Sequence, residues 1–168
     1  MDILIRIATA FSARVSPAAV VEIVHPGTHE YDEALHFQGR DWREITCDEW
    51  ASYSDAIYAF SPPAFCYFLP GMLSAAIRED KADLLITDAL INMLDRSPNR
   101  ETWDSFFVER WPLLTTAECR AVQQWILWLA DHPAKFDDDS LTRSYETLEI
   151  LATKQLKAFA SGTGVVKG

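Results

Sequence analysis

The apolar residues of this chain recur mostly at the spacing of an α-helix. In the clearest segment, after Pro62, phenylalanine, leucine and methionine side chains return every three or four residues as far as Ala76. The same period predicts further helices over residues 2–14, 30–38, 48–60, 82–96, 101–110, 115–131 and 141–160. Helical segments joined by short loops predict a compact all-α, single-domain bundle of about six to eight helices.

The boundaries of these helices carry capping and proline signals. Ser61 followed by Pro62 predicts an N-cap and a first helical residue, and Asp48 is a candidate cap for the segment that it opens. Pro70 lies inside the strongest helical period. Because proline has no N–H and crowds the preceding turn, Pro70 predicts a kink or a break in that helix.

Other segments set the limits of the domain. Thr115 and Glu118 have the spacing of a capping box at the start of a helix.

Residues 18–24 are rich in valine and predict one short strand at most. Serine and glycine then end the last helix, so we predict a single helical domain over residues 1–160 and a frayed C-terminal tail over residues 161–168.

Charge narrows the classes of partner. The chain has 25 acidic and 15 basic residues, a net charge of −10, and the acidic excess lies before residue 140. Such a surface repels nucleic-acid phosphates and anionic lipids, so we predict no nucleic acid and no membrane as partner. A basic protein partner fits this charge, although acidity also serves solubility alone.

The cysteines and the N-terminal residues indicate the cellular compartment of the protein. Cys47, Cys66 and Cys119 are widely spaced and do not form the paired pattern of a zinc ribbon or a thioredoxin-type site. The N-terminal residues lack the pattern of a signal peptide, and no apolar run is long enough for a membrane span. We therefore predict a cytoplasmic location.

No common catalytic motif occurs, which disfavours an enzyme without excluding one. The richest polar cluster lies between His25 and His36. Within it, His29, Glu33 and His36 share one helix face and would suit Zn²⁺ or acid–base chemistry, whereas a solvated helix face explains the same spacing. No ligand from a second segment is evident in the sequence, so we predict no cofactor.

Three consecutive carboxylates, Asp137, Asp138 and Asp139, could attract Mg²⁺ or Ca²⁺. Consecutive side chains point in different directions, however, and this run directly precedes a helix, where negative charge is favourable. Helix capping is therefore the better interpretation of the run.

Aromatic residues are dense between residues 42 and 68, and their helical spacing predicts that most of them form core. Trp42, Tyr58 and Tyr67 have polar neighbours or lie off the main stripe. We expect these three side chains to be the exceptions that reach a surface or a pocket.

Two stretches carry a family resemblance. Residues 39–45, GRDWREI, and residues 60–73, FSPPAFCYFLPGML, resemble the G-x-x-W-R-E and L-S-P-x-A-F-x-Y-Y-L-P-x-x-L signature of small uncharacterised bacterial proteins, a domain of unknown function. The resemblance covers roughly residues 3–130 and departs from the pattern at Pro63, Cys66, Phe68 and Gly71. It implies a bacterial origin but no activity and no site residues. Helix initiation and aromatic burial also explain the second stretch without an active site.

Small size, acidity and the lack of catalytic motifs favour a non-enzymatic protein-binding module. Its most specific form is a bacterial immunity protein that neutralises a basic toxin. The alternative is an enzyme or a small-ligand or metal-binding protein that uses the His25–His36 region and nearby aromatics. An interface built from acidic side chains around exposed aromatics gives the predicted partner-binding residues. These are Glu30, Asp32, Glu33, Asp41, Trp42, Glu44, Tyr67, Asp137, Asp138 and Asp139.

Overall fold

The computed structural model describes residues 2–22, 26–132 and 135–162, with side chains of the last helix as far as residue 154. Over these residues the fold is all-α, as the apolar period predicts. The α-helices are α1 (Ile3–Ala10), α2 (His29–Leu35), α3 (Cys47–Ser52), α4 (Ala56–Ala59), α5 (Pro62–Arg78), α6 (Leu85–Leu94), α7 (Ser105–Arg110), α8 (Thr116–Ala130) and α9 (Asp138–Gly162). Three short 3₁₀ helices are η1 (Trp42–Glu44), η2 (Arg100–Thr102) and η3 (Trp111–Leu113).

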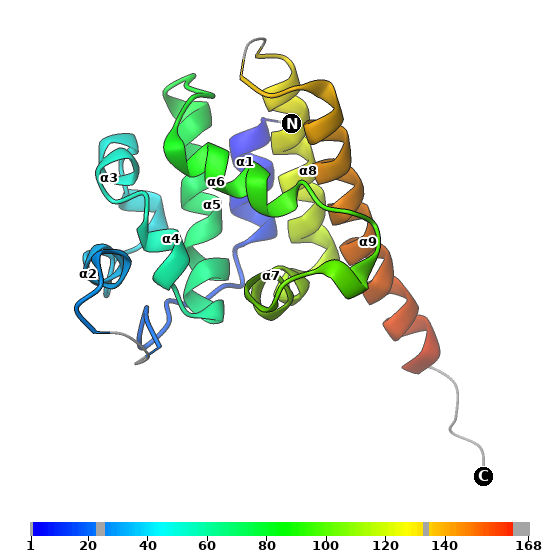
Figure 1. Ribbon diagram of the computed structural model, residues 1–168, viewed down its shortest axis with the longest axis horizontal. Coiled ribbons are helices and arrows are strands. Elements are labelled where there is room, and N and C mark those ends of the chain that lie inside the picture. Colours follow the sequence, from blue (N-terminus) through cyan, green and yellow to red (C-terminus); the bar gives the residue numbers. More distant parts are fainter. Residues whose placement is uncertain (1, 23–25, 133–134, 163–168) are drawn as a thin grey trace.

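Helix α5 lies in the middle of the molecule (Figure 1). Helices α2, α3 and α4 lie on one flank of it, and α8 and α9 form the other flank, with α1 packed against both α5 and α8. Every residue of α5 from Ala64 to Ala76 is buried. An amphipathic helix buries one stripe, whereas α5 is covered on all sides, as a central helix is.

The start of α5 follows the sequence prediction, but its interior does not. The Ser61 hydroxyl accepts a hydrogen bond from the Ala64 N–H at 3.3 Å, and Pro62 is the first helical residue. Of the kink or break predicted at Pro70, the break is wrong, because α5 continues as one α-helix to Arg78. Tertiary packing around a fully buried helix outweighs the cost of one missing intrahelical hydrogen bond.

The segment predicted as one helix over 48–60 is two helices, α3 and α4. The cap of α3 is Thr46 rather than Asp48, which corrects the prediction. The Thr46 hydroxyl accepts the Glu49 N–H at 3.2 Å, and the Glu49 carboxylate accepts the Thr46 N–H at 3.0 Å. The capping box predicted at Thr115 and Glu118 is confirmed at the start of α8.

The possible strand at 18–24 is reduced to one antiparallel bridge between Val21 and Phe60. Part of that segment, residues 23–24, lies outside the described residues. Helix α9 is helical through Gly162, two residues beyond the predicted end of the domain. The rest of the predicted tail, residues 163–168, lies outside the described residues as well.

The two motif stretches meet in the core. Trp42, from the first stretch, is buried against Gly71, from the second. A Cβ atom added at Gly71 would lie 2.9 Å from the Trp42 carbonyl oxygen, 3.3 Å from the Trp42 Cβ and 3.5 Å from the Trp50 ring. Close packing of η1 on α5 therefore accounts for a glycine in the middle of a helix.

We expect Gly71→Ala to destabilise the protein by about 1–3 kcal/mol, because the added methyl group meets a backbone oxygen that cannot rotate away. Helix propensity alone predicts the opposite, a gain of about 1 kcal/mol for alanine over glycine. Urea unfolding of the two proteins measures the difference. A more stable variant would show that Trp42 and α5 are not in tight contact.

Candidate functional site

The predicted aromatic anchors of a partner surface are not at the surface. Trp42 is 2% exposed and Tyr67 is 4% exposed, so the expectation that these two side chains reach a surface is wrong. Polar neighbours in the sequence do not keep them in solvent, because η1 and α5 pack against each other. Of the three aromatics expected outside the core, only Tyr58 is exposed.

The acidic residues predicted beside those aromatics divide into two groups. Asp32 and Glu44 are exposed, and Glu30 is half-buried at the surface of α2. Asp41 accepts the Arg43 N–H at 2.9 Å and so caps η1. Neither of the two predicted aromatic anchors is exposed beside these four carboxylates, and only Glu30 lies near an exposed tyrosine, because it lines a pocket with Tyr58.

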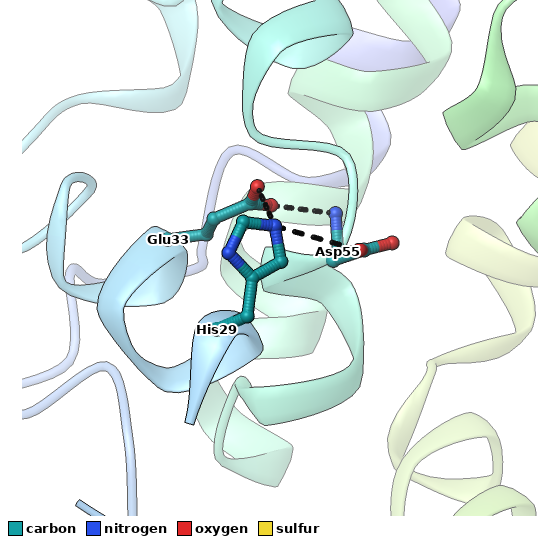
Figure 2. A group of neighbouring side chains, drawn as sticks. All are labelled: His29, Glu33 and Asp55. Atoms are coloured by element: carbon teal, nitrogen blue, oxygen red, sulfur yellow. Dashed lines mark hydrogen bonds and ion pairs between the residues drawn. The ribbon is translucent and has the colours of Figure 1, made fainter. Parts of the chain in front are cut away.

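Glu33 belongs to a different arrangement, on the inner side of α2. It is buried, and its carboxylate lies 2.8 Å from His29 Nε2 through Oε1. Its other oxygen accepts the backbone N–H of Asp55 at 2.8 Å. The Asp55 carboxylate approaches the same His29 nitrogen at 3.8 Å, as Figure 2 shows. One imidazole nitrogen and two carboxylates therefore converge from α2 and from the residue that precedes α4.

His36, the third member of the predicted helix face, does not join this group. Its Nε2 lies 3.1 Å from Glu49 Oε1, and its ring stacks on Tyr53. Hydrogen bonds from the Thr46 backbone, Arg40 and His36 lower the pKa of Glu49 to about 2. The predicted trio is corrected because His36 contacts Glu49 and Tyr53 in place of His29 and Glu33. His25 lies outside the described residues.

The aspartate run lies at the start of α9, and its first residue caps the helix. Asp137 accepts the Ser140 N–H at 2.8 Å, and this hydrogen bond lowers the pKa of its carboxyl group. Asp138 and Asp139 lie in the first turn of α9, and both are exposed. Asp138 also lines a groove that the sequence did not indicate.

This groove lies between α8 and α9, which run antiparallel on one flank of the fold (Figure 1). It has a volume of about 630 Å³. Its lining is mainly apolar and comes from Ile126, Leu127, Ala130, Leu141 and the Tyr145 ring. Leu127 is 48% exposed, which makes it one of the few large apolar side chains that face solvent.

Carboxylates border the groove along α9. Asp138, Glu146 and Glu149 all line it, and no described lysine or arginine lines it with them. Glu149 forms an ion pair with Arg120 of α8, and hydrogen bonds from Arg120 and Gln123 lower its pKa to about 2. The groove is thus an apolar floor with three carboxylates along its α9 edge, one of which is paired with Arg120.

No protein-family model, curated protein or solved structure matches this chain. The family resemblance of the two motif stretches therefore stays a hypothesis, and no activity is carried over from a relative. Among the described residues, no helix is long and apolar enough to cross a membrane.

Sequence reasoning missed Asp55, Leu127 and Glu146. Leu127 lies next to Trp128 and off the buried face of α8. A leucine at such a position is the one feature of the sequence that could have indicated the groove. Asp55 had no signal at all. It lies 22 residues from Glu33 in the sequence, and only the packing of α2 on α4 brings the two residues together.

Proposed function

We propose that this chain is a non-enzymatic, cytoplasmic protein-binding module that docks a basic amphipathic helix of a partner protein in the α8–α9 groove. The observation that supports it is the combination of an exposed apolar floor with an acidic edge. Three free, buried cysteines are compatible with a reducing compartment.

The shape of the groove favours a helix as the occupant. Two antiparallel helices leave a straight furrow, and amphipathic helices commonly bind in such furrows through their apolar face. Leu127 and Tyr145 would contact that face. Burying an exposed leucine contributes about 1.5–3 kcal/mol, so a few such contacts suffice for a micromolar complex.

The charge of the groove favours a basic occupant. Asp138 and Glu146 form no ion pair with a described side chain, so both carboxylates are available to lysine or arginine on the partner. A negative edge also steers a positive partner toward the groove before contact. A basic toxin whose amphipathic segment enters the groove would be the immunity form of this function.

The test uses a fluorescent synthetic helix of leucine and lysine, and a leucine–glutamate helix with the same apolar face as its control. We expect micromolar binding of the basic helix and at least tenfold weaker binding of the acidic one. Leu127→Asp should weaken binding by about tenfold or more, the loss of one buried leucine. Glu146→Lys should slow association about threefold to tenfold at low salt and much less at high salt.

Two substitutions on other faces are the matched controls. Leu85→Asp changes a leucine that is 65% exposed, and Glu101→Lys reverses an exposed charge, both outside the groove. Each should bind the basic helix as the wild type does. Equal affinities for Leu127→Asp and Leu85→Asp would overturn the docking proposal and leave the small-ligand or metal-binding alternative ahead.

A further inference from the structure

The group formed by His29, Glu33 and Asp55 has a feature that the docking function does not use. Glu33 is a buried carboxylate, and its described partners are the His29 ring and the backbone N–H of Asp55. No described lysine or arginine forms an ion pair with Glu33 or Asp55. Burying a carboxylate is costly unless a cation or several hydrogen bonds compensate it.

The carboxylate of Asp55 does not cap the helix that it precedes, α4. Asp55 occupies the N-cap position of α4, yet its side chain makes no capping hydrogen bond there. One of its carboxylate oxygens, Oδ2, lies 3.8 Å from His29 Nε2 (Figure 2).

The three ligand atoms lie close enough together to reach one metal ion after small shifts. Glu33 Oε1 and Asp55 Oδ2 lie 2.8 Å and 3.8 Å from His29 Nε2, and all three atoms lie within 4.8 Å of one another. A tetrahedral ion with bonds of about 2.0–2.1 Å separates its ligands by roughly 3.4 Å. Shifts of well under 2 Å in two exposed side chains would therefore complete the coordination.

We propose that His29, Glu33 and Asp55 bind one divalent transition-metal ion, with Zn²⁺ as the preferred probe. His29 Nε2, Glu33 Oε1 and Asp55 Oδ2 are the protein ligands, and water takes the fourth position. Imidazole together with carboxylates suits Zn²⁺ better than Mg²⁺, which prefers oxygen ligands alone. The Asp55 N–H that binds the second oxygen of Glu33 holds this ligand in place, as outer-sphere hydrogen bonds do in metal sites.

The site differs in one respect from the other histidine–carboxylate pairs of the fold. His36 and Glu49 lie 3.1 Å apart, and His132 and Asp80 lie 2.8 Å apart, but neither pair gathers a third ligand. Among the described residues, only the His29 group brings three such atoms together. His36 is therefore a matched control, a half-buried histidine just beyond the same helix that already contacts a carboxylate.

The experiment is calorimetric titration of ZnCl₂ into the metal-free full-length chain, with MgCl₂ as a second titrant. We expect one Zn²⁺ per chain and at least hundredfold weaker Mg²⁺ binding. His29→Ala and Asp55→Asn should each weaken Zn²⁺ binding by at least tenfold, whereas His36→Ala should change it less than threefold. Because His29 and Asp55 are half or more exposed, neither change should unfold the protein, which circular dichroism checks.

Thermal unfolding gives an independent readout. Zn²⁺ at a hundredfold excess over its dissociation constant should raise the midpoint of the wild type and of His36→Ala by about 5 °C or more, but not that of His29→Ala. Absence of Zn²⁺ binding by the wild type, or equal binding by His29→Ala, would overturn the proposal. The groove lies on the other flank, so none of these results depends on the docking function.

Discussion

Replacing Glu118 with alanine is expected to lower the free energy of unfolding by about 3–4 kcal/mol. Glu118 is 2% exposed, and both of its oxygens accept hydrogen bonds of 2.7 Å from the Arg14 guanidinium. One of these oxygens also accepts the Thr115 N–H, so the residue caps α8 as well. The variant leaves the half-buried Arg14 guanidinium without its carboxylate and Thr115 without its acceptor, and a partly buried charge that loses its partner is costly.

Two further variants separate the two roles of Glu118. Glu118→Gln keeps an acceptor for the Thr115 N–H and removes the charge. The decrease in its free energy of unfolding therefore measures the contribution of the ion pair. Thr115→Ala removes only the reciprocal cap and should cost about 1 kcal/mol. Urea unfolding at neutral pH compares all three with the wild type. If Glu118→Ala costs no more than Thr115→Ala, the ion pair between α8 and the segment after α1 adds no stability.

Replacing Trp50 with alanine is expected to cost about 3–5 kcal/mol. The indole ring is fully buried and stacks on Phe37 with 4.6 Å between ring centres. The indole ring also makes edge-on contacts with Phe60 and Phe68, with 6.5 Å and 6.4 Å between ring centres. These rings come from separate segments that also contact one another, so the structure cannot collapse easily into the space that the indole leaves.

Trp50→Phe is the control for this experiment. The indole N–H of Trp50 makes no hydrogen bond to a described group, so phenylalanine removes volume and little else. We expect a loss of about 1–2 kcal/mol. Thermal and urea unfolding measure both variants. A cost below about 1 kcal/mol for Trp50→Ala, the effect of an average substitution, would show that this aromatic cluster is not the centre of the core.

The two proposed sites use opposite flanks of α5 (Figure 1). The groove depends on α8 and α9, whereas the metal ligands come from α2 and the residue before α4. Changes this far apart, with no shared contacts, are expected to act additively. Leu127→Asp should therefore leave Zn²⁺ binding unchanged, and His29→Ala should leave binding of the basic helix unchanged.

The fold class and most helix starts follow from the sequence because they depend on residues close together in the chain. Ser61 caps α5 and Thr115 caps α8 through residues only three positions away. The Thr46 and Glu49 capping box has the same spacing, so its signal is present in the sequence as well. The net charge of −10 is likewise a property of the sequence.

Only the tertiary structure decided the sites. Trp42 and Tyr67 are buried, and Glu33 lies next to Asp55, because helices far apart in the sequence pack together. Helix α5 stays continuous through Pro70 for the same reason. Local patterns record interactions over about four residues, the reach of one helical turn. Burial, and the meeting of two carboxylates with one imidazole, depend on the surface that another segment presents, and periodicity carries no information about that surface.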